Sequence, residues 1–375
     1  MTTTSTSPSS APSPATAPSP TPSPATTSSA ATPLATPHVR HRATEAERLD
    51  VAAAIEATRE EYERVRHVIP AAEWATFAQD VVAIRELKRT RDAVVLAHNY
   101  QTPEIFHGVA DLVGDSLALA RMAQEVEAQT IMLAGVPFMA ETAKLLNPGK
   151  TVLVPDAGAG CSLADGITVA DIEALRAAHP GVPVVTYVNS SAAVKAASDI
   201  CCTSGNVEKI VRHLGAERII CVPDEYLARN VAAATGVEVI THPARCEVHE
   251  RFSVADIAQL RSERPGITVI AHPECSPEVV AAADVAGSTA QMLDHVTTHR
   301  PPQVALITEC SMADNIRAAQ PDLEYVQPCN LCPHMRRSTL AGIRAALETG
   351  GPQVTLDPAT AAGARRAVER MLELS

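Results

Sequence analysis

Short apolar runs alternate with amphipathic segments along residues 91–337 of this 375-residue chain. The apolar runs have the length of strands, and the segments between them carry apolar residues at helical spacing. Strands that alternate with helices in this way are typical of parallel α/β units. The pattern therefore predicts an α/β fold built on parallel sheets.

The apolar runs recur in the same order three times. First runs lie at 94–98, 184–187 and 269–272, third runs at 131–133, 219–221 and 304–306, and fourth runs at 151–154, 237–240 and 323–326. A short second strand is expected between the first and third runs. Self-similarity of this kind indicates repeated domains. We expect three pseudo-symmetric three-layer αβα domains, each with a four-stranded parallel sheet, around a central cavity.

The repeats set the expected domain boundaries. They cover residues 91–180, 181–265 and 266–337. Residues 41–90 should form helices over about 44–69, where Thr44 and Glu47 form a capping box, and about 74–88. Residues 338–375 should form helices over about 338–348 and 358–374. Residues 1–40, which are rich in Ser, Thr, Pro and Ala, are expected to be a disordered tail.

Each repeat also carries an Asp followed five residues later by a hydroxyl. The pairs are Asp111 with Ser116, Asp199 with Ser204, and Asp284 with Thr289. We expect each hydroxyl to open a helix, where free N–H groups favour carboxylate or phosphate. Ligands of parallel α/β sheets bind beyond the carboxyl ends of the strands. Three such helix starts around one cavity predict a small substrate with several anionic groups.

Three of the nine cysteines share the period of the repeats. Cys161, Cys246 and Cys332 follow the fourth strands and are 85 and 86 residues apart. Three convergent thiolates suit a soft metal centre, either an iron–sulfur cluster or zinc. A [4Fe–4S] cluster with three cysteine ligands leaves one iron open to act as a Lewis acid.

The other cysteines have no such period. Five of them are expected to be inert: Cys201, Cys202, Cys221, Cys275 and Cys310. Cys329 forms a CxxC with Cys332, which is compatible with zinc, with a redox pair or with neither. A reversible Cys329–Cys332 bond would remove one ligand from the metal centre.

Composition narrows the possible functions. A net charge of −12 argues against general binding to nucleic acid or acidic membranes. The aromatic content of 3% argues against a base-stacking or aromatic-cage surface. The longest nearly apolar run, 131–140, is broken by Gly135 and Pro137, so no transmembrane helix is expected. The odd cysteine count, without a secretory segment, favours a reducing cytoplasm.

Several motifs, in order, resemble the bacterial quinolinate synthase (quinolinate synthetase A) family from about residue 70 to the end. They are AHNYQ (97–101), VGDSL (113–117), GVPFMAETAK (135–144), CSL (161–163), YVNSSA (187–192), CEVH (246–249), HPE (272–274), GST (287–289) and CPHM (332–335). The family makes quinolinate, a precursor of NAD, from iminoaspartate and dihydroxyacetone phosphate.

The resemblance implies roles for particular residues. Cys161, Cys246 and Cys332 would bind a [4Fe–4S] cluster. Substrate contacts would come from His98, Ser116, Tyr187, Asn189, Ser204, His249, His272, Glu274 and Thr289. Glu274 and His272 are candidates for general acid–base catalysis, and Tyr100 for a proton donor or gate. A functional link to an iminoaspartate-producing enzyme is expected.

Two rival functions fit parts of the sequence. The diphthamide-forming radical enzyme has a similar three-domain cluster architecture, but it needs S-adenosylmethionine and a protein partner. The motifs at 97–100, 187–189 and 272–274 argue against it. A non-enzymatic iron–sulfur sensor needs no set of anion-binding helix starts, and the net charge of −12 disfavours a nucleic-acid-binding face.

Overall fold

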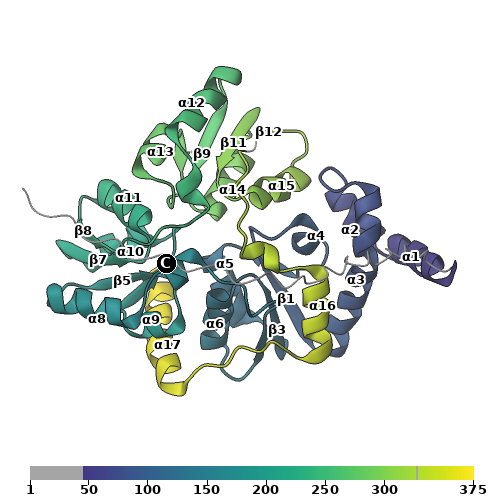
Figure 1. The fold of residues 1–375 in the computed structure, drawn as a ribbon, viewed down its shortest axis with the longest axis horizontal. Coiled ribbons are helices and arrows are strands. Elements are labelled where there is room, and N and C mark those ends of the chain that lie inside the picture. Colours follow the sequence, from purple (N-terminus) through teal and green to yellow (C-terminus); the bar gives the residue numbers. More distant parts are fainter. Residues whose placement is uncertain (1–44, 327) are drawn as a thin grey trace, which may run out of the picture. The chain divides into compact units, whose positions relative to one another are not determined.

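Three four-stranded parallel sheets organise the computed structural model, which describes residues 45–375 except residue 327 (Figure 1). Their strand orders are β2-β1-β3-β4, β6-β5-β7-β8 and β10-β9-β11-β12, so the first strand lies between the second and third in every sheet. The strands are β1 Ala93–His98, β2 Leu112–Gly114, β3 Thr130–Ala134, β4 Thr151–Leu153, β5 Val184–Tyr187, β6 Ile200–Cys202, β7 Arg218–Val222, β8 Glu238–Thr241, β9 Thr268–Ala271, β10 Val285–Ala286, β11 Gln303–Ile307 and β12 Glu324–Val326. The predicted α/β fold with three αβα domains is confirmed, and we number the domains 1 to 3 by these sheets.

Helices connect the strands within each sheet, lie between successive sheets and follow the last strand. They are α4 Pro103–Phe106, α5 Ser116–Glu125, α6 Pro137–Leu146, α7 Ser162–Asp165, α8 Val169–Ala178, α9 Ala192–Ala196, α10 Val207–Leu214, α11 Glu225–Thr235, α12 Val254–Glu263, α13 Pro277–Ala282, α14 Thr289–His299 and α15 Cys310–Ala319, with the short 3-10 helices η1 His249–Arg251 and η2 Met335–Arg337. Because the strands of each sheet are parallel, the loops that leave their carboxyl ends lie at one edge of that sheet.

The repeated aspartates have one structural role in all three domains. The carboxylates of Asp111, Asp199 and Asp284 accept N–H bonds of 2.7–2.8 Å from the first strands, at Val95, Val184 and Val269. Each carboxylate also pairs with a cation from the helix that precedes the first strand of its sheet: Lys88, Arg176 or Arg261. The repeated Asp therefore stabilises the sheet just before the second strand begins. The hydroxyl five residues later follows the second strand, at its carboxyl end.

The amino-terminal helices differ from the prediction in one place. The helix expected over 44–69 is divided into α1 Glu45–Ala57 and α2 Arg59–Val65, followed by α3 Ala71–Thr90. At the break, the buried Thr58 hydroxyl donates to the Ala54 carbonyl and accepts from the indole N–H of Trp74 at 3.0 Å. The expected capping box at Thr44 and Glu47 and the expected tail lie outside the residues whose side chains are described.

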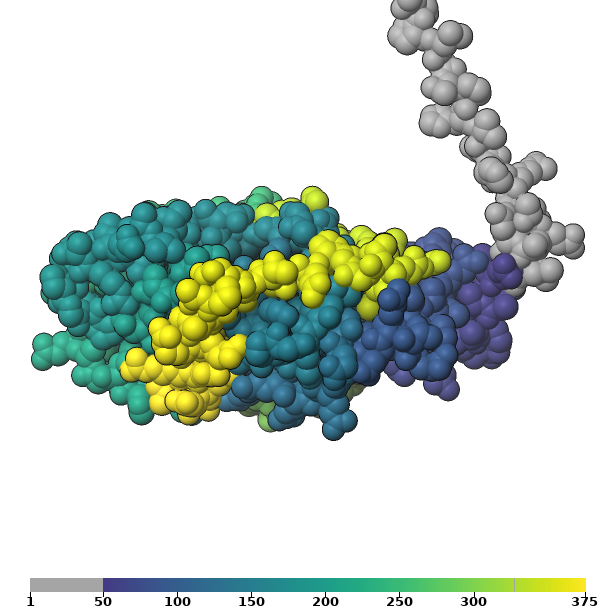
Figure 2. Space-filling view, turned by 90° about the horizontal axis from the view of Figure 1, so that it is seen from below, coloured from purple at the N-terminus to yellow at the C-terminus, as the bar shows by residue number. Residues whose placement is uncertain are grey.

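The carboxyl-terminal helices connect two domains. α16 Leu340–Thr349 packs on α3, and α17 Pro358–Glu373 packs on α9 and β6 of domain 2. In Figure 2 this segment is the yellow band that runs from the blue to the teal surface. Gly363 permits close packing, because a Cβ there would lie 2.9 Å from the Cβ of Ala196.

Within the described part of the chain, every helix is too short or too polar to cross a bilayer. The boundaries expected between the repeats stay predictions.

Candidate active site

One cavity, with about 740 Å³ of empty volume including its opening, brings together all thirteen residues singled out from the sequence. Its lining includes His98, Tyr100, Ser116 and Cys161 from domain 1, Tyr187, Asn189, Ser204, Cys246 and His249 from domain 2, and His272, Glu274, Thr289 and Cys332 from domain 3. Ligands of parallel α/β sheets commonly bind at this position, beyond the carboxyl ends of the strands. The roles of the individual residues stay predictions.

Cys161, Cys246 and Cys332 each begin the same kind of turn. In each turn the cysteine carbonyl accepts an N–H bond of 2.9–3.2 Å from the residue four positions on, Asp165, Glu250 or Arg336. The backbone N–H groups two and three positions on interact with the sulfur: Leu163 and Ala164, Val248 and His249, and His334 and Met335. The fold therefore presents three sulfurs in equivalent settings, each beside two N–H donors.

Burial disfavours charge on these three thiols. It raises the pKa of Cys161 to about 12 and that of Cys332 to about 11, and it raises the pKa of Cys246 well above its usual range. All three thiols are free of disulfide bonds. A bound metal centre would supply the positive charge that buried thiolates lack, and the six N–H groups would stabilise the sulfurs. This donor set fits a cluster with three cysteine ligands.

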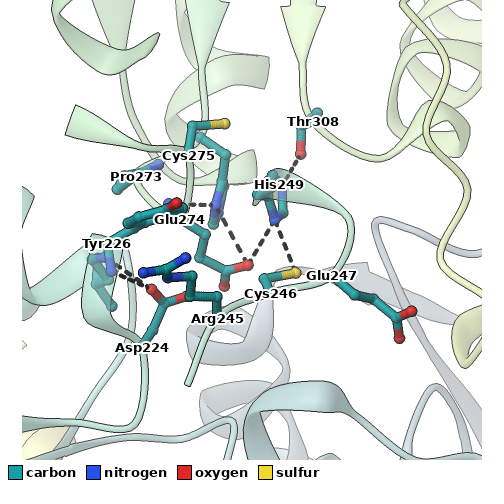
Figure 3. Close-up of polar contacts among 12 residues, drawn as sticks. Asp224, Tyr226, Arg245, Cys246, Glu247, His249, Pro273, Glu274, Cys275 and Thr308 are labelled. Atoms are coloured by element: carbon teal, nitrogen blue, oxygen red, sulfur yellow. Dashed lines mark hydrogen bonds and ion pairs between the residues drawn. The ribbon is translucent and has the colours of Figure 1, made fainter. Parts of the chain in front are cut away.

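A second set of possible metal ligands overlaps the first. One ligand atom from each of Cys246, His249 and Glu274 lies within 4.8 Å of the others. His249 Nδ1 is 3.2 Å from Cys246 Sγ and 2.7 Å from a carboxylate oxygen of Glu274 (Figure 3). Cys246 therefore belongs to two candidate groupings, the three cysteines and this mixed trio.

Glu274 lies at the centre of a buried polar network. Tyr187 donates a 2.6 Å hydrogen bond to one carboxylate oxygen, and His249 Nδ1 contacts the other. The ring of His272 stacks on that of His249 with centroids 4.6 Å apart. Burial alone would raise the pKa of Glu274, but His249, His272 and the hydrogen bonds together hold that pKa below its usual range. The carboxylate is therefore ionised at neutral pH.

His98 and His272 occupy equivalent settings in domains 1 and 3. Nδ1 of each accepts the N–H of the residue two positions on, Tyr100 at 3.1 Å and Glu274 at 3.3 Å. Burial lowers the pKa of His98 to about 4 and that of His272 to about 3. Both rings are thus neutral near pH 7, and the Nδ1 contacts place the proton on Nε2.

The predicted helix starts are confirmed in two domains and wrong in the third. Ser116 and Thr289 are the first residues of α5 and α14, capped by Asp115 and Ser288. Ser204 instead lies three residues before α10. The reason is local: the Asn206 side chain accepts the Thr203 N–H at 2.6 Å and holds a turn ahead of the helix.

Two buried oxygens that line the cavity have no hydrogen-bond partner among the described residues. They are Asn189 Oδ1 and Thr203 Oγ1. Buried polar atoms are normally paired, so these two fit contact with a polar ligand. None of the described lining residues is Lys or Arg. Attraction for an anion would therefore come from helix N-termini and histidine N–H groups.

The sequence reasoning missed three buried residues at this site. Asn99 donates a 2.8 Å hydrogen bond to Thr289 Oγ1. Thr308, directly after β11, contacts Tyr100 and His249. Glu309 caps α15, accepts the N–H of Cys332 at 3.3 Å, and has a pKa raised by burial to about 7. One signal was available, since Glu309 lies 85 residues after the acidic cap Asp224, which matches the period of the repeats.

The cysteine predictions need one correction. Cys310 was expected to be inert and Cys329 to be a possible partner of Cys332, but Cys310 and Cys329 form a disulfide. The β-bridge between Glu309 and Asn330 brings the start of α15 beside the loop before Cys332, so that the two Cα atoms lie 5.1 Å apart. The remaining four cysteines are buried and free, as predicted: Cys201, Cys202, Cys221 and Cys275.

Comparisons with known proteins point to one family. The family model described as "Quinolinate synthetase A protein" matches residues 82–373. The quinolinate synthase of Agrobacterium fabrum is 66% identical over 313 residues, which cover 84% of this chain and 91% of that protein. Those of Xylella fastidiosa and Caulobacter vibrioides are 66% and 52% identical over 298 and 317 residues, covering 80% and 84% of this chain and 88% and 86% of those proteins.

Proposed function

This chain belongs to the quinolinate synthase family, and we propose that it condenses iminoaspartate with dihydroxyacetone phosphate. The products are quinolinate, phosphate and two molecules of water, which balances all atoms of the two substrates. The reaction makes the enzyme a transferase of de novo NAD biosynthesis. We expect it to act in the cytoplasm, beside an enzyme that produces iminoaspartate.

The observation that carries this proposal is the threefold cysteine arrangement in one cavity. Cys161, Cys246 and Cys332 would hold a [4Fe–4S] cluster, with two backbone N–H groups beside each sulfur. When bound, such a cluster supplies an iron without a protein ligand, which can act as a Lewis acid. Zinc held by Cys246, His249 and Glu274 is the competing assignment.

Substrate binding follows from the polar groups around the cavity. The N-termini of α5 and α14, at Ser116 and Thr289, would receive carboxylate or phosphate groups. Asn189 and Ser204 would add hydrogen bonds from domain 2. The neutral rings of His98 and His272 would donate from Nε2, which suits anionic oxygens without adding a full charge. Three domains would thus hold the two substrates in one orientation.

Buried groups that contact one another would carry out the acid–base catalysis. Ionised Glu274 can take a proton at a carboxylate oxygen when the new C–C bond forms, with Tyr187 and His249 fixing its orientation. Burial raises the pKa of Tyr100 well above its usual range, so its hydroxyl stays protonated and can donate to a leaving hydroxyl. His272 would support this exchange through its stacked contact with His249.

The test is product identification under anaerobic conditions. Purified enzyme receives dihydroxyacetone phosphate and iminoaspartate generated in the same vessel, and quinolinate and phosphate are quantified by mass spectrometry and a colorimetric assay. The proposal requires equal amounts of quinolinate and phosphate. Phosphate release without a pyridine product, or no turnover by metal-loaded enzyme, would contradict it.

A further inference from the structure

We infer that Thr308 is a positioning residue for Tyr100 in the reaction proposed above, on which this inference rests. Thr308 is 1% exposed and lies between the end of β11 and the cap of α15. Its Oγ1 is 2.6 Å from the Tyr100 hydroxyl and 3.0 Å from His249 Nε2. One hydroxyl of domain 3 therefore contacts a side chain of domain 1 and a side chain of domain 2. Figure 3 shows its contact with His249.

The contact at the far end of this network fixes His249. The carboxylate of Glu274 only accepts, so His249 Nδ1, 2.7 Å away, donates to it. This contact orients the ring, and Nε2 lies against Thr308 Oγ1. Either hydroxyl can donate in the bond between Thr308 and Tyr100. When Thr308 donates, the proton of Tyr100 is left for a leaving hydroxyl in the cavity.

Other contacts fix the rest of Tyr100 but not its hydroxyl. Its backbone N–H is bonded to His98 Nδ1, and its ring lies edge-on to the ring of His98 with centroids 4.8 Å apart. The hydroxyl is 3.5 Å from His249 Nε2, which is a weak contact beside the 2.6 Å bond to Thr308. Thr308 thus determines where the reactive end of Tyr100 lies.

The test compares Thr308→Val, which keeps the shape and removes the hydroxyl, with Thr308→Ser, which keeps the hydroxyl. We expect Thr308→Val to lower kcat about 10-fold, as loss of a buried hydrogen bond implies, with KM changed less than about threefold. Thr308→Ser should stay within about threefold of the wild type. Iron and sulfide content should be the same in all three proteins.

A double-mutant cycle separates positioning from a general structural role. If Thr308 acts through Tyr100, Thr308→Val should cause little further loss in a Tyr100→Phe background. An equal loss in both backgrounds, or a loss of iron in Thr308→Val, would overturn the inference. So would wild-type kcat in Thr308→Val.

A measurement that needs no turnover tests this inference separately from the proposed function. The chain has five tyrosines, so protein labelled with 3-fluorotyrosine gives a simple 19F spectrum in which Tyr100→Phe identifies one resonance. That resonance should shift or broaden in Thr308→Val and not in Thr308→Ser. An unchanged resonance contradicts the inference. If it shifts while the wild type makes no quinolinate, the positioning holds and the proposed reaction fails.

Discussion

The turns that carry Cys246 and Cys332 have equivalent positions, but different contacts stabilise them. In domain 2, Asp224 caps α11 and forms an isolated β-bridge with Ala244, two residues before Cys246. In domain 3, Glu309 caps α15 and forms an isolated β-bridge with Asn330, two residues before Cys332. Glu309 is one methylene longer and also accepts the N–H of Cys332, while the Asp224 Oδ2 atom has no partner among the described residues.

The domain 2 turn has a different kind of support. His249, three residues after Cys246, reaches across to Glu274 and Thr308 of domain 3. The turn of Cys246 is therefore held between domains, while the turn of Cys332 is held within one domain by Glu309. Changes at the first turn should affect the geometry shared between domains, and changes at the second should affect one turn and its stability.

Glu274→Gln breaks the link between domains and should have the largest effect. The amide cannot take a proton, and its contact with His249 Nδ1 is altered, so kcat should fall about 100-fold or more. Initial rates of quinolinate formation measure the loss, with iron content unchanged. Glu278→Gln, at the exposed start of α13, is the matched control and should behave as the wild type. Near-normal activity of Glu274→Gln contradicts its role.

Glu309 should make the stability of the apoprotein depend on pH. Burial raises its pKa from 4.5 to about 7, so the folded chain holds this proton more tightly than the unfolded chain. The resulting stabilisation is fully present below about pH 4.5 and is lost as the pH rises through about 7. Between these values the free energy of unfolding should fall by about 3 kcal/mol more in wild type than in Glu309→Gln. Urea unfolding across that pH range measures it, and parallel profiles would contradict the assignment.

Asp224 should show a smaller effect that depends on its oxygen rather than on its charge. Burial, followed by the nearby charge of Glu274, raises the pKa of Asp224 well above its usual range, which disfavours the charged form of this group. Asp224→Asn keeps the cap and should change the free energy of unfolding by less than about 0.5 kcal/mol. Asp224→Ala removes the cap of α11 and should cost about 1–2 kcal/mol. Equal losses in the two variants would show that the charge matters.

Cys329→Ser should have the smallest effect on the metal centre. Cys329 pairs with Cys310, while Cys332 is free, so iron content should be the same as in wild type. Peptide mapping without reduction should recover the Cys310–Cys329 link in the wild type. A Cys329–Cys332 link, or loss of iron in Cys329→Ser, would reverse the interpretation of this loop.

The sequence predicts most of the strands of the three sheets, and it predicts that the site residues lie together, because strands and cysteines recur with one period. It does not predict the features that depend on contacts between distant loops. The pairing of Cys310 with Cys329 depends on the bridge between Glu309 and Asn330. Thr308 has no distinctive pattern around it, and its contacts exist only once three domains meet. The late start of α10 follows from one side chain, Asn206, at a position where the other domains have Ala118 and Gln291.

The central claim is that Cys161, Cys246 and Cys332 together hold a cluster. Iron, sulfide and zinc are measured in anaerobically purified wild type, in the three single Cys→Ser variants, and in Cys201→Ser as a buried cysteine control. We predict about four irons and four sulfides per chain in wild type and control, with marked loss in each of the three variants. Zinc in place of iron, or a site that needs Cys246 but neither Cys161 nor Cys332, would contradict it.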